Sequence, residues 1–135
     1  MLDLDKMYHL ITPWLKEFNF TTDEIKEELD NSTPDGIEDI EVQLGKMINL
    51  LETEKFVVYR GHFCSTRQEN EFEICEIYAT SDAMIAWKAS VNFENTIRKE
   101  IIEHGSSDEH GGIVVVLTKN ESKLTFMTDC EDVFQ

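Results

Sequence analysis

The sequence contains few cysteines and no long apolar run. Its three cysteines, Cys64, Cys75 and Cys130, are odd in number and widely spaced, and no CxxC pair occurs. This pattern is typical of thiols in a reducing compartment and not of a disulfide framework. No apolar segment approaches the ~20 residues that span a bilayer, and the N-terminus lacks the basic and apolar regions of a signal peptide. We therefore expect a cytoplasmic protein.

The common short catalytic motifs are also missing. No P-loop, GxSxG, HExxH or EF-hand pattern occurs. The histidines and acids between His104 and His110 lie in a Gly/Ser-rich segment without the ligand spacing of a zinc site. His62 and Cys64 share one face of a predicted strand, but no third group is placed to orient a nucleophilic pair. The sequence therefore predicts no metal and no cofactor, and it favours a protein that is not an enzyme.

Basic residues are scarce. The chain has 12 Lys and Arg against 28 Asp and Glu, a formal net charge of −16. This charge repels nucleic-acid phosphates and anionic membranes, so we expect direct binding to neither. It favours a basic protein as partner, although solubility alone also accounts for an acidic composition.

The acid is concentrated in one part of the chain. Residues 17–41, the acidic stretch, hold ten acids and one base, Lys26, a net charge of −9. Like charges four residues apart on a helix destabilise it slightly, although acids in the first turn of a helix are favoured by its dipole. We interpret the stretch as a surface for a basic partner. The candidate binding residues are Asp23, Glu24, Glu27, Glu28, Asp30, Asp35, Glu38, Asp39 and Glu41.

The length and composition predict a single domain over residues 1–135. At 41% hydrophobic residues, a chain of this size buries enough surface to fold without disulfides or metal. Helices are expected before a sheet, and the clearest helix runs from Gly36 to Glu54. Its apolar residues recur at helical spacing, and four of them should pack against the sheet: Ile40, Leu44, Met47 and Leu51.

Residues 56–128 predict four strands and one helix. Phe56 to Phe63 and Phe72 to Ala79 form a hairpin around the loop Cys64 to Glu71. The later elements are a helix from Asp82 to His104, a buried central strand from Ile113 to Leu117 and a strand from Lys123 to Thr128. We expect an α+β fold: N-terminal helices, then an antiparallel or mixed four-stranded sheet with helices on one face.

The helix after the hairpin has two apolar phases. Met84, Trp87 and Val91 form one phase, and Phe93 begins the other, which continues through Ile97 and Ile101. The change of phase predicts a bend near Asn92 or two shorter helices, with Trp87 in the core.

One pair of short motifs resembles a known family. Tyr59-Arg60-Gly61 on the first strand of the hairpin, with Tyr78-Ala79-Thr80-Ser81 at the end of the second, is similar to the arginine-specific mono-ADP-ribosyltransferases. The resemblance implies that Arg60 binds NAD, that Ser81 supports the nicotinamide pocket and that Glu131 is the catalytic acid. The first serine of the family's middle motif is replaced here by Ala79.

Three functions are left open by the sequence. The leading hypothesis is a small acidic interaction protein, such as an inhibitor, an immunity protein or a nucleic-acid mimic. It would occupy a basic site on a nuclease or another nucleic-acid-binding protein. The alternatives are the NAD-binding transferase and an acidic secretion or assembly chaperone, which needs an exposed apolar surface.

Overall fold

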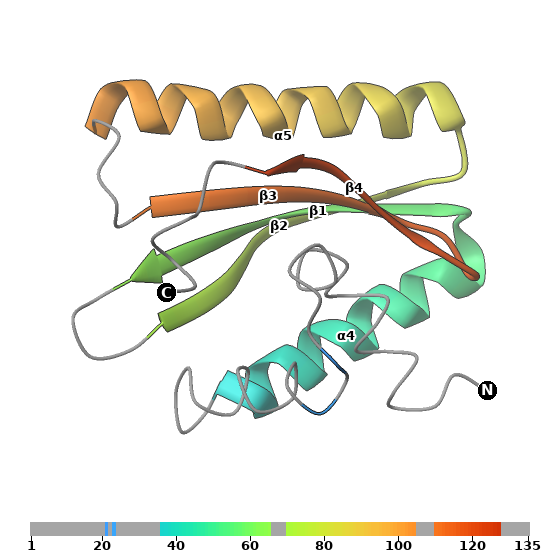
Figure 1. The fold of residues 1–135 in the computed structure, drawn as a ribbon. Helices are drawn as coiled ribbons and strands as arrows, with labels where there is room; N and C mark the ends of the chain where they lie inside the picture. Colours follow the sequence, from blue (N-terminus) through green and yellow to red (C-terminus); the bar gives the residue numbers. More distant parts are fainter. Residues whose placement is uncertain (1–20, 22, 24–35, 66–69, 105–109, 128–135) are drawn as a thin grey trace.

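A computed structural model of the chain describes residues 21, 23, 36–65, 70–104 and 110–127, and among them the side chains of residues 21, 23, 42, 43, 45–61, 74–103 and 112–127. The helices and strands follow in the order α4 (Gly36–Thr53), β1 (Phe56–Ser65), β2 (Asn70–Thr80), α5 (Ala83–His104), β3 (His110–Leu117) and β4 (Ser122–Met127) (Figure 1). The predicted order of helix, two strands, helix, two strands is confirmed for this part. The predicted N-terminal helices lie outside it.

The four strands form one sheet in the order β2-β1-β3-β4, and every neighbouring pair is antiparallel. The mixed α+β class and the central position of β3 are therefore confirmed. α5 carries the chain from the edge strand β2 across β1 to β3. The strands are longer than the sequence predicts: β1 and β2 extend into the expected hairpin loop, and β3 begins at His110 rather than Ile113.

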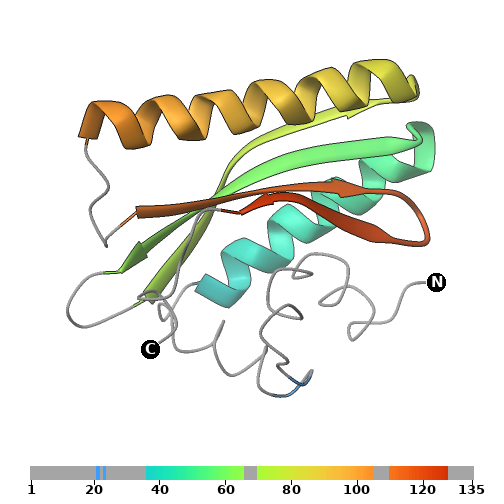
Figure 2. The ribbon, with the colours of Figure 1, turned by 45° about the horizontal axis from the view of Figure 1, so that its top comes forward.

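The two helices lie on opposite faces of the sheet, so the expectation of helices on one face is wrong. α5 covers one face and α4 lies against the other, as two views of the ribbon agree (Figures 1 and 2). The physical reason is that β1 and β3 are apolar on both faces. Val57, Val58 and Tyr59 are consecutive and all fully buried, which requires cover on each side because neighbouring side chains point to opposite faces.

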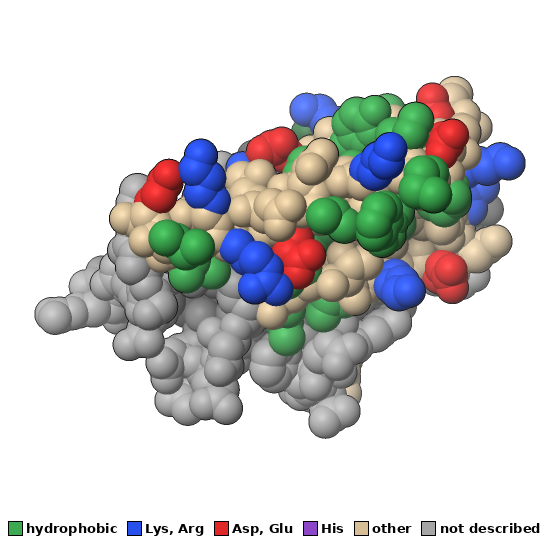
Figure 3. Space-filling view, turned by 90° about the horizontal axis from the view of Figure 1, so that it is seen from above, with side chains coloured by type: hydrophobic (Ala, Val, Ile, Leu, Met, Phe, Trp, Pro, Cys, Tyr) green, Lys and Arg blue, Asp and Glu red, His purple; other side chains and the backbone are tan. Residues whose placement is uncertain are grey.

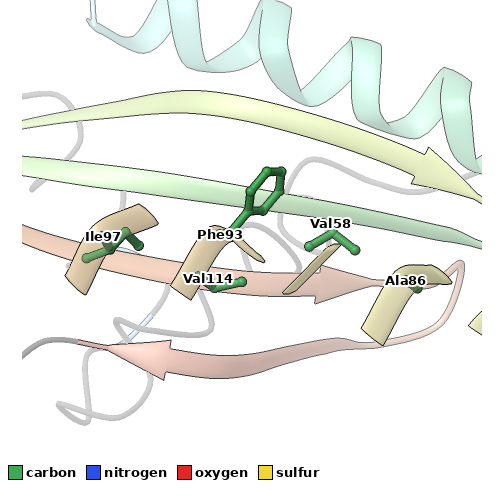
Figure 4. Packing of buried hydrophobic residues seen from close by; sticks show 5 residues of the cluster. All are labelled: Val58, Ala86, Phe93, Ile97 and Val114. Carbon is green, nitrogen blue, oxygen red and sulfur yellow. The ribbon is translucent and has the colours of Figure 1, made fainter. Parts of the chain in front are cut away.

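The face under α5 contains a closely packed apolar cluster. Five buried side chains form it, two from the central strands and three from the helix: Val58, Val114, Ala86, Phe93 and Ile97 (Figure 4). Partly buried residues of all three layers surround them, including Phe56 on β1 and Phe126 on β4. Because the cluster joins α5 to both central strands, it fixes how the helix lies on the sheet.

The face under α4 contains the alternate residues of the same strands. Val57 and Tyr59 on β1 are buried, as are the odd-numbered β3 residues from Ile113 to Leu117. On the helix, Met47 and Leu51 are buried, which confirms two of the four predicted core positions of α4. The side chains of the other two, Ile40 and Leu44, lie outside the described set.

A β-bulge divides β2 into two halves. Arg60 pairs with Glu76 and the next residue, Gly61, pairs with Ile74, so that Cys75 is the additional residue on β2. The extra residue reverses the alternation of side chains along the strand. Ile74 is therefore buried on the α4 face, whereas Glu76 points to the α5 face and reaches Arg60.

α5 is one continuous helix of 22 residues, so the predicted bend near Asn92 is wrong. The predicted N-cap is confirmed: Asp82 Oδ1 accepts hydrogen bonds from the backbone N–H groups of Met84 and Ile85, at 2.9 and 3.1 Å. The buried phase of the helix begins at Ala86 and includes Ser90 and Phe93. The second apolar phase needs no bend, because it faces solvent.

Candidate functional site

The acidic stretch is described only in part. Asp23 is exposed, and Glu38, Asp39 and Glu41 belong to the first turns of α4, although their side chains lie outside the described set. Acids in the first turn of a helix interact favourably with its dipole. The remaining candidate residues, from Glu24 to Asp35, precede the described part of α4. The proposal of one contiguous acidic surface therefore stays a prediction.

Arg60 lies at the centre of an ion-pair network on the α5 face of the sheet. Its Nε donates to Glu76 Oε1 at 2.9 Å, and its Nη2 lies 2.8 Å from the same oxygen. Its Nη1 is 3.8 Å from Oε1 of Glu100 on α5. The Arg60 side chain is only 13% exposed, so the guanidinium fastens the edge strand β2 and the helix to β1.

Ser81 serves a different junction. Its hydroxyl donates to Glu54 Oε2 at 2.6 Å and accepts a hydrogen bond from the backbone N–H of Lys55 at 3.3 Å. Thr80, the preceding residue, accepts from the N–H of Asp82. These bonds connect the end of α4 to the start of α5, where the chain leaves β2.

The residues of the predicted NAD site are therefore held by separate networks. Ser81 follows Thr80, which pairs with Phe56, four residues along β1 from Arg60. Four strand residues correspond to roughly 13 Å. The third residue, Glu131, lies outside the described part of the chain. The NAD-binding alternative stays a prediction.

An exposed apolar surface on α5 was missed from the sequence. Trp87, predicted to be core, is 61% exposed, and Met84 is 60% exposed. Figure 3, which looks down on α5, shows apolar side chains gathered over the half of the helix nearer its start, with basic and acidic side chains around them. The signal was present in the sequence: the series Ala86, Ser90, Phe93 continues the inward phase without a break and leaves the Met84 phase outside.

The neighbours of this surface come from both ends of the sheet and helix. Ile85 is exposed on α5, and Tyr78 is exposed on β2, where it pairs with Val58 of the α5-facing cluster. Farther along the helix, Arg98 lies over the ring of Phe126, 4.9 Å from its centroid, and its Nη2 is 3.0 Å from Glu94 Oε1. Arg98 thereby closes the β4 side of α5 with charged groups.

Other candidate chemistry was sought across the molecule. Among the side chains that the structure describes, no three His, Cys, Asp or Glu residues are grouped so that they could hold a metal ion. No helix within the described ranges is long and apolar enough to cross a membrane. Comparison with protein-family models, with curated proteins and with solved structures finds no match to this chain.

Proposed function

We propose that this chain is a small acidic interaction protein that occupies a basic site on a partner protein, as an inhibitor, immunity protein or nucleic-acid mimic does. The observation that carries the proposal is the uneven distribution of charge. The acidic stretch has a net charge of −9, whereas α5, on the opposite face of the sheet from α4, has three acids and three bases. A requirement for solubility alone gives no reason for this difference.

The acidic stretch acts in this proposal by electrostatic attraction. Its carboxylates resemble a series of phosphates in charge, so a surface that evolved to bind nucleic acid would accept them. Such complementarity accelerates association and is screened by salt. The residues assigned to this role are the nine candidates from Asp23 to Glu41, with Glu17 at the edge of the stretch.

The experiment compares two charge reversals of equal size. Asp23→Lys with Glu27→Lys changes the acidic stretch, and Glu52→Lys with Glu121→Lys changes two exposed acids outside it. Each double substitution moves the net charge from −16 to −12. Wild type and both variants are used to capture proteins from cells of the source organism at low and high salt. The captured proteins are identified by mass spectrometry.

The expected result is a basic protein that the wild type and the control variant retain at low salt and that the acidic-stretch variant loses. With that protein purified, the acidic-stretch variant should associate about tenfold or more slowly, with a smaller change in dissociation. Equal losses in both variants would show that only total charge matters. Retention by all three proteins would place the interface elsewhere and overturn the assignment.

The second candidate function is an acidic secretion or assembly chaperone. The observation in its favour is the exposed apolar surface of α5, since a chaperone of this kind needs apolar contacts with its client. This alternative predicts that Trp87→Glu abolishes client binding while the reversal of Asp23 and Glu27 has little effect. The two candidates are therefore separated by the same binding assay.

A further inference from the structure

The outer face of α5 has the spacing of a helix–helix contact. We define this face by Met84, Trp87, Val91 and Ile102. The first three follow at intervals of three and four residues, as in the seam between packed helices. Met84 and Ile102 are 18 residues apart, which is five full turns, so they lie on the same side of the helix. Both are strongly exposed, at 60% and 82%.

The length of this face limits what can cover it. Eighteen residues of helix correspond to about 27 Å, with bulky apolar residues at the start and an isolated Ile102 near the end. A short apolar anchor would cover Trp87 and leave Ile102 in water. An occupant that contacts both residues must extend along the whole helix, as a second α5 does.

The charges of α5 favour a copy of the same helix in the opposite direction. Residues 83–92 contain one charged side chain, Lys88, whereas residues 93–104 contain three acids and two bases. The halves therefore have net charges of +1 and −1. Antiparallel packing places each half on the half of opposite sign, and it also opposes the two helix dipoles favourably. A parallel pair would bring like halves together.

We propose that the protein forms a homodimer through this face, with the two α5 helices antiparallel about a twofold axis near the middle of the helix. Met84 and Trp87 of each copy then lie against the second half of the other α5, near its Ile102. Two copies that each have a charge of −16 repel one another over most of their surface. α5 offers a contact where acids and bases balance and where apolar side chains are available to be buried.

The first experiment measures the oligomeric state by sedimentation velocity over about 1 to 100 µM protein. Wild type is expected to be a dimer that dissociates on dilution. Trp87→Glu and Ile102→Glu should each weaken dimerisation by at least 100-fold, roughly the effect of losing a central apolar anchor. The matched control is Val42→Glu, which places the same charge at a 54% exposed position of α4 and should leave the dimer unchanged.

The second experiment tests the orientation of the helices. In a full-length chain whose three native cysteines are replaced by serine, Met84→Cys and Ile102→Cys are introduced separately and the two proteins are mixed under oxidising conditions. An antiparallel pair should give the mixed disulfide between positions 84 and 102. A symmetric disulfide between two copies of position 84 would overturn the antiparallel arrangement, because that pairing requires the helices to start together. Circular dichroism checks that each variant is folded.

The outcomes separate this inference from the proposed function. A wild type that remains monomeric up to about 100 µM, or a dimer that survives both glutamate substitutions, overturns the dimer. If a monomeric wild type also loses its basic partner on Trp87→Glu, the α5 outer face belongs to the partner interface and not to a second copy. The reversal of Asp23 and Glu27 should leave the dimer intact, because these acids lie outside α5.

Discussion

The two helices cover opposite faces of one sheet, but they differ in what they present to solvent. α4 buries Met47 and Leu51 and follows directly from the acidic stretch, so its side of the molecule is associated with the largest excess of negative charge. α5 buries Phe93 and Ile97, and it exposes Trp87 in a helix whose charges balance. The comparison teaches that packing on the sheet determines only the inner half of each helix. The outer half is free to serve binding, and the two helices differ there.

The largest expected effect distinguishes the two sides of α5. Phe93→Ala should destabilise the protein by about 3–5 kcal/mol, because it leaves a cavity between the helix and the sheet. Trp87→Ala should change the stability of the monomer by less than about 0.5 kcal/mol, since surface positions contribute little. Urea unfolding at a protein concentration low enough to dissociate a dimer measures both. Equal losses for the two variants would show that Trp87 is part of the core.

A smaller effect, of opposite sign on the two faces, is expected at two glycines. A Cβ at Gly112 would lie 2.8 Å from Ile97 Cγ2, in the layer between β3 and α5. Gly112→Ala should therefore destabilise the fold by about 1–3 kcal/mol through overpacking. A Cβ at Gly45 of α4 meets nothing within 4 Å, so Gly45→Ala should stabilise the helix by about 0.5–1 kcal/mol. Thermal unfolding of the two variants compares them, and a loss at both positions would indicate that α4 is packed as closely as α5.

The smallest expected effect concerns Arg60. Arg60→Ala should cost about 1 kcal/mol, because the partly exposed Glu76 and Glu100 lose their shared partner. Addition of about 1 mM NAD should leave the melting temperature unchanged in wild type and variant alike, since a ligand stabilises a protein only if it binds the folded state. A rise in the wild type that disappears in Arg60→Ala would instead support the transferase alternative.

The sequence predicted the elements better than their arrangement. The Asp82 cap, the hairpin and the buried run of β3 each depend on neighbouring residues, and a local pattern is enough to recognise them. The placement of α4 and α5 on opposite faces depends on both sides of β1, where the run of Val57 and Val58 already required cover on each face. This consequence was drawn for β3 but not for β1.

Two other differences have specific causes. Gly111 and Gly112 resemble loop residues in a sequence, yet they begin β3, and at Gly112 the close approach of Ile97 leaves no room for a side chain. The bulge at Cys75 is not marked by a glycine or a proline. For the candidate site, the sequence identified the acidic stretch and Arg60 but placed Trp87 in the core, because an apolar residue in a helix is more often buried than exposed.

The bulge in β2 also bears on how the protein can assemble. An edge strand has unpaired backbone groups that can join the edge of another molecule and extend a sheet without limit. β2 is interrupted by Cys75 and carries Glu71, Glu73 and Glu76 along its length, so strand-to-strand addition of a second acidic chain is opposed by both geometry and charge. Association through one helix about a twofold axis uses the same surface on both copies and ends at two. Growth into open fibres is disfavoured at this edge, which keeps a chain rich in β-structure from polymerising through β2.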